Sequence, residues 1–440
     1  MIGLLLVAVL AGSALVGDVD PPGTDTAAQV DPTSQTGGAD ASGAAADRTA
    51  AATWVSGWQG SPTAGEGSDH AACPADTGLD DQTVRNIVPV STGGGQVRVR
   101  LSNAFGAKPL QVGAASVGIA GPGASIQPGP LLPLLFGGQP SVLVAAGAEA
   151  VSDPVPLTVQ PLQRLAVSVY LPGRTGPATQ HDNSREINYL ASADRTADPA
   201  ADPFGPIGCW MFASGVDVLA PARVAGTVVT LGDSLTDGER STPGAGQRYP
   251  DWLARRLLSL SGTTLSVSNA GISGNEVLYD RDPALAGVAA PARLGRDVLG
   301  QAGVRSVILL EGTNDIGDRG ATAQQLVQVY QQIAAQVHAA GLPVYIGTLP
   351  PFGGSNAAYG GDYGSVAGQQ QRSAVNDWIR TQQVFDGVID FDAALRDPAA
   401  PDQLMPLYDS GDHLHPSDAG YRRMAEAVDL PQLVAASTRG

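Results

Sequence analysis

The sequence predicts two folded regions of different class, an all-β domain followed by an α/β domain. Residues 53–221 contain short alternating runs such as QVRVRLSNAFG, broken by Gly and Pro, without a long segment of helical periodicity. Residues 222–440 instead alternate apolar, strand-like runs with amphipathic stretches. That alternation is typical of a parallel sheet covered on both faces by helices. A chain of 440 residues is long enough for both domains.

The all-β domain, residues 53–221, is predicted to be a β-sandwich or jelly roll. VSVYLPG alternates, and SDPVPLTVQP adds further short runs. The only two cysteines of the chain, Cys73 and Cys209, lie near the two ends of this domain. In an exported protein such a pair predicts one disulfide, and the alternative is two unpaired buried thiols. No Cys-x-x-Cys or His cluster surrounds either cysteine, so a metal site is not expected.

The α/β domain, residues 222–440, is predicted from successive strands and helices. Strands are expected at VAGTVVTL, TTLSVSN, VRSVILLEG, PVYIGTL and GVIDF. Helices are expected at YPDWLARRLLSL, from about Ala323 to Ala340, around Val375, and at SDAGYRRMAEAV, where Ser417 is a plausible cap. In such sheets, functional sites gather at the carboxyl ends of the strands.

The N-terminus predicts an exported protein. Residues 1–17 form a short apolar stretch with small residues near its end, as in a secretory signal peptide. No Lys or Arg precedes the apolar run, and the alternative is an uncleaved N-terminal anchor, with the protein facing outside. Residues 18–52 hold almost no large apolar side chain, which predicts a disordered linker. We therefore expect a secreted protein that keeps no stable membrane partner after signal cleavage.

The overall charge excludes one class of partner. The formal net charge is -17 and the pI is about 4.5. Nucleic-acid binding depends on clustered Lys and Arg side chains that neutralise phosphates, so a nucleic-acid partner is not expected for this acidic chain.

A serine stands directly after the first strand of the α/β domain, in GDSLTDG. Taken alone, Ser234 could be a helix cap in a turn. As a nucleophile it needs a base, and the base needs an orienting group. DHLHPSD offers Asp412 and His415, three residues apart, whereas Asp409 and His413 form a rival pair four apart.

Two further fragments follow strand-like runs. NAGISGN contains Gly274, which could offer a backbone N–H, and EGTND contains Asn314, which could offer a side-chain amide. With the backbone N–H of Ser234, these would be three donors for an oxyanion. The alternatives are a turn role for Asn314 and a purely conformational role for Gly274.

The four blocks GDSLTDG, NAGISG, GTND and DHLH, in this order, resemble those of the SGNH, or GDSL, hydrolase superfamily. The resemblance covers most of the C-terminal half of the chain and implies a flavodoxin-like three-layer α/β/α fold. It also implies Ser234 as the nucleophile, Asp412 and His415 as the other triad members, and Ser234, Gly274 and Asn314 as the oxyanion hole. The G-x-S-x-G signature of α/β-hydrolases is absent from the chain.

The function implied by the resemblance is that of a secreted serine esterase without cofactor or metal. Secreted two-domain members include enzymes that deacetylate polysaccharides, often with a jelly-roll partner, so an acylated polysaccharide is the favoured substrate. The alternatives are a lipase or acyl-lipid esterase, and a non-catalytic glycan-binding protein on the same fold. The intact set of five site residues speaks against the non-catalytic alternative.

Several residues near these blocks receive lesser roles. Asp233, Asp237 and Asp315 are expected to accept hydrogen bonds that shape loops. His181, in TQHDNS, is expected either to contact a ligand or to lie on the surface. The Tyr- and Gly-rich segment 356–368 is a candidate rim of the site.

Overall fold

The computed structural model describes residues 52–67, 73–281 and 286–438. The predicted signal peptide, residues 1–17, and the predicted linker, apart from its last residue, lie outside these ranges. The described residues belong to one compact unit. Within the described ranges, every helix is too short or too polar to cross a lipid bilayer.

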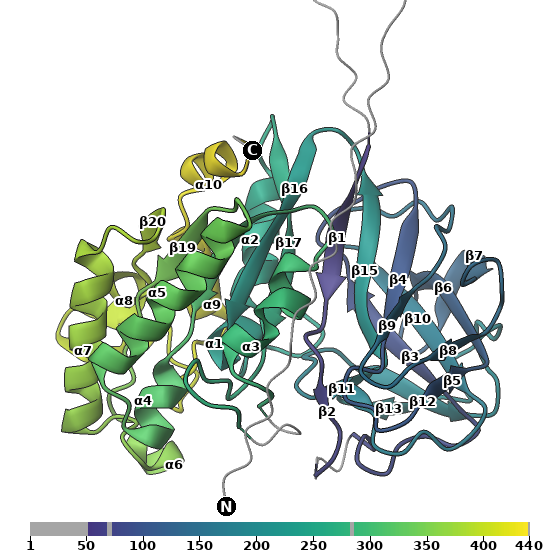
Figure 1. Cartoon of the computed structure of the whole chain (residues 1–440), viewed down its shortest axis with the longest axis horizontal. Coiled ribbons are helices and arrows are strands. Elements are labelled where there is room, and N and C mark those ends of the chain that lie inside the picture. Colours follow the sequence, from purple (N-terminus) through teal and green to yellow (C-terminus); the bar gives the residue numbers. More distant parts are fainter. Residues whose placement is uncertain (1–51, 68–72, 282–285, 439–440) are drawn as a thin grey trace, which may run out of the picture. The chain divides into compact units, whose positions relative to one another are not determined.

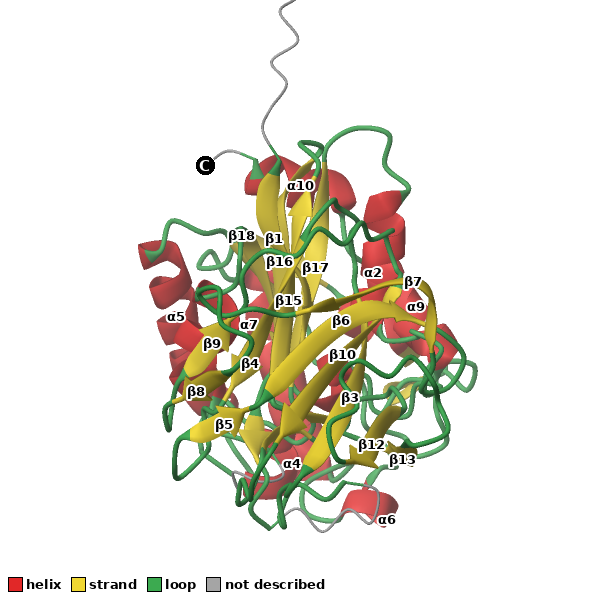
Figure 2. Cartoon of the chain, turned by 90° about the vertical axis from the view of Figure 1, so that its right-hand side faces the viewer, coloured by secondary structure: helices red, strands yellow, loops and turns green. Residues whose placement is uncertain are grey.

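The N-terminal part of this unit is largely β-sheet, as predicted (Figure 2). One sheet has the order β13-β12-β3-β10-β6-β7. Its strands are β3 (Gln82–Pro89), β6 (Ala114–Ala120), β7 (Ile126–Pro133), β10 (Arg164–Leu171), β12 (Asn188–Ser192) and β13 (Gly205–Ile207). A second has the order β1-β15-β4-β9. Its strands are β1 (Thr53–Gln59), β4 (Val97–Ser102), β9 (Glu149–Val151) and β15 (Ala213–Ala220).

Two smaller sheets complete this part. One contains β2 (Thr63–Ala64), β11 (Thr179–His181) and β14 (Trp210–Met211), and the other contains β5 (Leu110–Val112) and β8 (Val142–Val144).

The two larger sheets enclose a single apolar core. On β4 every second side chain is buried, beginning with Val97 and Val99, and these pack in one cluster with Val167 and Val169 of β10. This alternation is the sequence pattern from which the sandwich was predicted. Cys73 and Cys209 are joined by a disulfide beside this core.

The C-terminal part contains a five-stranded parallel sheet with the order β17-β16-β18-β19-β20 (Figure 1). Numbered along the chain this is the order 2-1-3-4-5, which is the flavodoxin-like order implied by the resemblance. The strands are β16 (Val224–Gly232), β17 (Thr264–Gly271), β18 (Val304–Leu310), β19 (Val344–Gly347) and β20 (Gly387–Ile389).

The helices form two groups that connect these strands. In one group α2 contacts α9, and in the other α5 contacts α3 and α7. The helices are α1 (Ser234–Asp237), α2 (Tyr249–Leu258), α3 (Ala290–Leu294) with the π-helical turn η1 (Gly295–Leu299), α4 (Thr313–Arg319), α5 (Ala323–Ala339), α6 (Asn356–Tyr359), α7 (Val366–Thr381), α8 (Phe391–Leu395), α9 (Asp418–Glu426) and α10 (Leu430–Ser437).

The C-terminal part also contains a small antiparallel two-stranded sheet, formed by β21 (Arg396–Asp397) and β22 (Ala400–Leu404).

Helix α5 shows why the sequence could place such elements. Leu326, Tyr330 and Ile333 recur at helical spacing and are fully buried against the sheet. The Thr322 side chain caps the first turn by accepting a hydrogen bond from the backbone N–H of Gln325. The backbone N–H of Thr322 in turn donates to the side-chain oxygen of Gln325.

Strand β1 links the β-sheet part to the parallel sheet. It pairs with β15, and its Ser56 also meets β17, since Ser266 Oγ donates to the Ser56 carbonyl over 2.6 Å. The hydroxyls of Ser56 and Ser268 lie 3.0 Å apart in the same buried boundary. The two parts are therefore tied together by buried polar contacts.

Candidate active site

Three segments that carry the predicted site residues leave adjacent strands of the parallel sheet. Ser234 follows β16, Gly274 follows the neighbouring edge strand β17, and Asn314 follows β18 on the other side of β16. Because parallel strands end at one edge of the sheet, these segments meet there. The fold thus brings together residues separated by up to 80 positions in the sequence.

Ser234 is the first residue of the short helix α1. The preceding residue, Asp233, caps this helix, because its Oδ1 accepts from the backbone N–H of Leu235 over 2.9 Å. Ser234 is 7 % exposed. Its hydroxyl lies 2.9 Å from Nε2 of His415, which is within hydrogen-bond distance.

His415 lies in the loop that leads to α9. Its Nδ1 is 2.9 Å from Oδ2 of Asp412, so one ring nitrogen faces a carboxylate and the other faces the serine. The rival pair, Asp409 and His413, also forms, with 2.6 Å between carboxylate and ring, but His413 is about half exposed. Of the two pairs, only Asp412–His415 reaches Ser234, through Nε2 of His415.

The carboxylate of Asp412 is surrounded by donors. Oδ1 accepts from the backbone N–H groups of Leu414 and His415, at 3.0 and 2.8 Å. Oδ2 accepts from Tyr359 Oη at 2.8 Å and from Arg240 Nε at 3.1 Å, in addition to His415. Burial alone would raise the pKa of Asp412, but the hydrogen bonds and charge of His415 and these backbone amides hold it well below its usual range.

Tyr359 and Arg240 were missing from the sequence-based site. Tyr359 lies in the segment predicted as a rim, which was the one signal for it, whereas nothing in the sequence pointed to Arg240. The ring of Tyr359 also meets the ring of His415 edge-on, with centroids 5.7 Å apart. The rim segment therefore contacts the triad-like group itself.

Asn314 is oriented by two partners. Tyr363 Oη donates to its side-chain oxygen over 2.6 Å, and its Nδ2 donates to the carbonyl of Asn275 over 2.9 Å. An amide nitrogen carries two hydrogens, so one N–H remains for a further acceptor. Gly274 adopts φ +78°, a conformation that favours glycine.

The backbone N–H groups of Ser234 and Gly274 donate to no acceptor within the part of the chain that is described. Together with Asn314, both residues line a cavity of about 390 Å³. The cavity is lined by Ser234, Glu239, Arg240, Ser273, Gly274, Arg281, Asn314, Asp318, Tyr359, Tyr363, Leu414 and His415. Leu414 is the only aliphatic side chain among these.

A layer of buried acids lies beneath this edge. Burial raises the pKa of Asp233 to about 7, against the hydrogen bond from the Leu235 amide. Burial likewise raises the pKa of Asp315 to about 6, although Asp315 accepts from the amides of Val277 and Leu278, and it raises that of Glu311 well above its usual value. Asp233 and Asp315 thus accept backbone hydrogen bonds, as predicted.

Arg293 is the cation of this layer. Its guanidinium donates to the carbonyls of Gly232 and Ala270, where β16 and β17 end, at 2.9 and 2.6 Å. It thereby ties together the two strand ends that precede Ser234 and Gly274. Across the described ranges, no three His, Cys, Asp or Glu side chains converge as metal ligands.

The expectation for His181 was wrong. It neither lines the cavity nor lies on the surface, because it is 4 % exposed and its Nε2 lies 3.1 Å from Oδ1 of Asp237. The two residues come from different parts of the fold, and a sequence pattern gives no signal for such a contact.

Several solved structures resemble the chain in part. A carbohydrate acetylesterase family member from Sinorhizobium meliloti has 19% identity, with 48% of this chain and 98% of that chain covered and a TM-score of 0.38. The native aryl esterase of M. smegmatis has 19% identity, with coverages of 46% and 95% and a TM-score of 0.35. A family two carbohydrate esterase from Clostridium thermocellum, in complex with cellohexaose, has 16% identity, coverages of 87% and 97%, and a TM-score of 0.35. At these values the likenesses carry no argument about activity.

A comparison with curated proteins found no match. A family model does match the region that holds most of the parallel sheet and the residues lining the cavity. The matched residues are 230–423, and the model describes the GDSL-like lipase/acylhydrolase family. Residues 230–423 of this chain are therefore a domain of that family.

Proposed function

We propose that this chain is a serine ester hydrolase that works through an acyl-enzyme. The observation that carries the proposal is the continuous arrangement of Ser234, His415 and Asp412, joined by two contacts of 2.9 Å at the carboxyl edge of the sheet. A serine hydroxyl becomes a nucleophile when a base accepts its proton, and this arrangement supplies the base and its orienting carboxylate.

In the first half of the reaction, Ser234 Oγ attacks the ester carbonyl carbon and its proton passes to Nε2 of His415. Asp412 accepts from Nδ1–H and stabilises the imidazolium. The carbonyl oxygen becomes an oxyanion, which accepts from the amides of Ser234 and Gly274 and from Asn314 Nδ2. When the tetrahedral intermediate collapses, the alcohol leaves with the proton held by His415.

In the second half, water attacks the acyl group on Ser234. His415 now accepts the proton of the water, and the same three donors hold the second oxyanion. Collapse of this intermediate returns the proton to Ser234 Oγ and releases the carboxylic acid. Ser234, His415 and Asp412 are thereby restored to their starting state.

We propose short acyl esters of polar alcohols, such as acetylated polysaccharides, as the substrate class. The cavity is lined by charged and hydroxyl-bearing side chains, including Glu239, Arg281 and Asp318. A long acyl chain gains about 0.8 kcal/mol for each CH₂ that it buries in apolar surroundings, and among the described lining residues only Leu414 and the rings of Tyr359 and Tyr363 offer such surface. The same polar groups can bond the hydroxyls of a carbohydrate.

We also propose that the protein is exported and that residues 53–221 and 222–440 act as accessory and catalytic domains. The disulfide between Cys73 and Cys209 supports export, because such bonds persist in oxidising compartments. Intact mass after alkylation without reductant tests the disulfide. Two alkylated cysteines in exported material would contradict it.

The proposal is tested by hydrolysis of p-nitrophenyl esters from acetate to palmitate, with wild type and Ser234→Ala side by side. We expect activity on the short esters that is lost in the variant, followed by release of acetate from acetylated xylan. Activity that peaks at long chains would make the protein a lipase. Equal activity in both proteins would exclude Ser234 as the nucleophile, and inactivity of wild type on every ester would favour a non-catalytic glycan-binding protein.

A further inference from the structure

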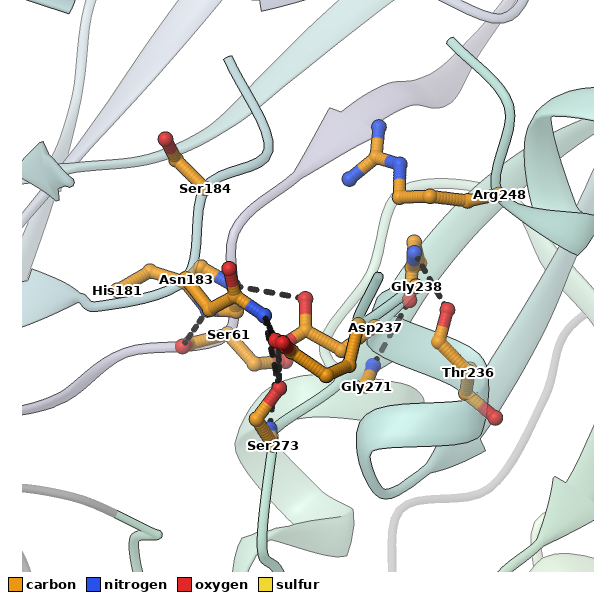
Figure 3. Close-up of polar contacts among 12 residues, drawn as sticks. Ser61, His181, Asn183, Ser184, Thr236, Asp237, Gly238, Arg248, Gly271 and Ser273 are labelled. Carbon is orange, nitrogen blue, oxygen red and sulfur yellow. Dashed lines mark hydrogen bonds and ion pairs between the residues drawn. The ribbon is translucent and has the colours of Figure 1, made fainter. Parts of the chain in front are cut away.

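His181 is buried where the β-sheet part meets the segments that carry Asp237 and Ser273 (Figure 3). It is the last residue of β11, and its ring stacks at a tilt on Trp210, with centroids 5.3 Å apart. Its Nδ1 lies 2.8 Å from the carbonyl oxygen of Ser61, and its Nε2 lies 3.1 Å from Oδ1 of Asp237. Asp237 is the last residue of α1, the helix that begins with Ser234.

The two partners of His181 indicate the charge of its ring. A carbonyl oxygen and a carboxylate oxygen both accept hydrogen bonds, so a ring that bonds both must donate from both nitrogens. His181 is then an imidazolium paired with a buried carboxylate. Burial and the nearby Arg248 guanidinium lower the pKa of His181, but Asp237 and the Ser61 carbonyl outweigh them and raise it above its usual value.

The second oxygen of Asp237 reaches the segment that carries a proposed oxyanion donor. Oδ2 accepts from the backbone N–H of Ser273 at 3.0 Å and from its hydroxyl at 2.7 Å. Gly274, the next residue, lines the cavity, and its backbone N–H donates to no acceptor among the described residues. Asp237 therefore bonds His181 through one oxygen and the turn before Gly274 through the other.

Close packing makes this arrangement rigid. A Cβ on Gly271 would lie 2.2 Å from the backbone nitrogen of Asp237, so the end of β17 and the end of α1 are in direct backbone contact. Asn183, two residues after His181, also donates to Ser273 Oγ over 3.1 Å. The segment 181–183 thus holds the Ser273 turn both directly and through Asp237.

We propose that His181 is a positioning residue for the esterase site. By holding Asp237, it fixes the end of α1 and the Ser273–Gly274 turn, and so aims the backbone N–H groups of Ser234 and Gly274 at the oxyanion. This inference rests on the proposed function. His181 belongs to β11 of the β-sheet part and lies outside the family domain at residues 230–423. The inference therefore makes the β-sheet part a component of the active site.

The role predicts a particular kinetic signature. The oxyanion forms only in the transition state, so misplaced donors lower kcat and leave KM nearly unchanged. Loss of one such donor typically costs about 10²–10³ in kcat, and a displaced donor costs less. We therefore expect His181→Ala to lower kcat at least tenfold, with KM within about twofold of wild type.

The matched control is Ser91→Ala. Ser91 Oγ meets Ser266 Oγ at 2.9 Å and accepts from the Val267 amide at 3.1 Å, across the same boundary but upstream of the Ser273 turn. The kinetics use p-nitrophenyl acetate, and the melting temperature of each variant shows that it folds. His181→Gln, which keeps one N–H donor for Asp237, serves as the conservative variant and is expected to recover part of kcat.

Three results would overturn the inference. The first is that wild type is active and both His181→Ala and His181→Gln have the same kcat as wild type. This result would leave the proposed function intact. The second is an equal loss of kcat in His181→Ala and Ser91→Ala, since the effect would then be general destabilisation. The third is a neutral His181 ring in nitrogen-15 NMR of the wild-type protein at pH 7. The inference expects both ring nitrogens to be protonated, and a neutral ring would contradict the ion pair with Asp237. Wild type without any esterase activity would instead remove the proposed function, and the inference with it.

Discussion

Two largely buried carboxyl groups flank the Ser234–His415 contact, and their pKa values are shifted in opposite directions. Asp412, in the loop before α9, receives donors on both oxygens, and its pKa is held well below its usual range. Asp233, beneath the serine, accepts from the Leu235 amide through one oxygen, and the other has no partner among the described residues. Its pKa is raised to about 7.

The difference shows what decides the charge of a buried carboxyl group. Removal from water favours the neutral acid in both cases, and only donors that bond the anion reverse that preference. For Asp412 these donors are the ring of His415 and the backbone amides of His415 and Leu414, all in its own loop. Tyr359 and Arg240, from other segments, bond the same carboxylate. The proposed catalytic carboxylate is thus kept charged, whereas Asp233, beneath Ser234, takes up a proton near neutral pH.

Among the variants that test this comparison between Asp412 and Asp233, Asp412→Asn is expected to lower kcat the most. An amide cannot stabilise the imidazolium of His415, and in a Ser–His–Asp triad such a change lowers kcat by roughly 10⁴. We expect a loss of that order, measured as kcat on p-nitrophenyl acetate with the melting temperature as a check of folding. A loss below tenfold in a folded variant would mean that Asp412 does not support the base.

Tyr359→Phe removes one donor from Asp412 and leaves the others. A hydrogen bond to a charged group contributes about 1.5–3 kcal/mol, part of which the remaining donors replace. We therefore expect kcat to fall by roughly tenfold, since 1.4 kcal/mol corresponds to that factor. An unchanged kcat would show that Arg240 and the backbone amides suffice to hold the carboxylate.

Asp233 makes the stability of the fold depend on pH. Between its usual pKa of 3.8 and about 7, the folded protein holds a proton that the unfolded chain releases, so stability falls as the pH rises through this window. Asp315, raised to about 6, acts in the same direction. We expect the melting temperature of wild type to be higher at pH 5.5 than at pH 8, by a few degrees, since each kcal/mol shifts it by roughly 1 °C in a unit of this size.

The control for this pH dependence is Asp233→Asn, which keeps the oxygen that accepts from Leu235 but cannot ionise. Its melting temperature should change less between pH 5.5 and pH 8 than that of wild type. Below about pH 4 the direction reverses, because Asp412 must then take up a proton that its lowered pKa resists. A wild-type melting temperature that rises steadily from pH 5.5 to pH 8 would contradict the burial argument.

The smallest effect is expected from His413→Ala. His413 pairs with Asp409 within the same loop, but it is about half exposed and does not contact Ser234. We expect kcat and KM within about twofold of wild type, measured on the same ester. A loss comparable with that of Asp412→Asn would identify His413 as the base in place of His415.

Much of the fold and the grouping of Ser234, Gly274 and Asn314 could be predicted from the sequence, because they depend on local patterns. Apolar runs and helical spacing locate the strands and helices, and the ends of parallel strands meet at one edge. The structure places these three residues there, with His415 and Asp412 beside Ser234. Their chemical roles remain predictions.

The supporting contacts could not be predicted, because they join segments with no shared pattern. His181 and Asp237 are 56 positions apart, and Arg240 reaches Asp412 across 172. A lone histidine in a β-rich segment gives no indication that it will lie against α1, the helix that begins with Ser234. The His181–Asp237 pair forms only because the β-sheet part packs against the part that contains the parallel sheet.

The central claim is that Ser234 is a nucleophile activated by His415 and Asp412. It is tested most directly by treating the wild-type protein with a fluorophosphonate and mapping the adduct by peptide mass spectrometry. We predict a single adduct on the peptide that contains Ser234, formed much more slowly in Asp412→Asn and at the wild-type rate in His413→Ala. No adduct, or one that maps to another residue, would contradict the account.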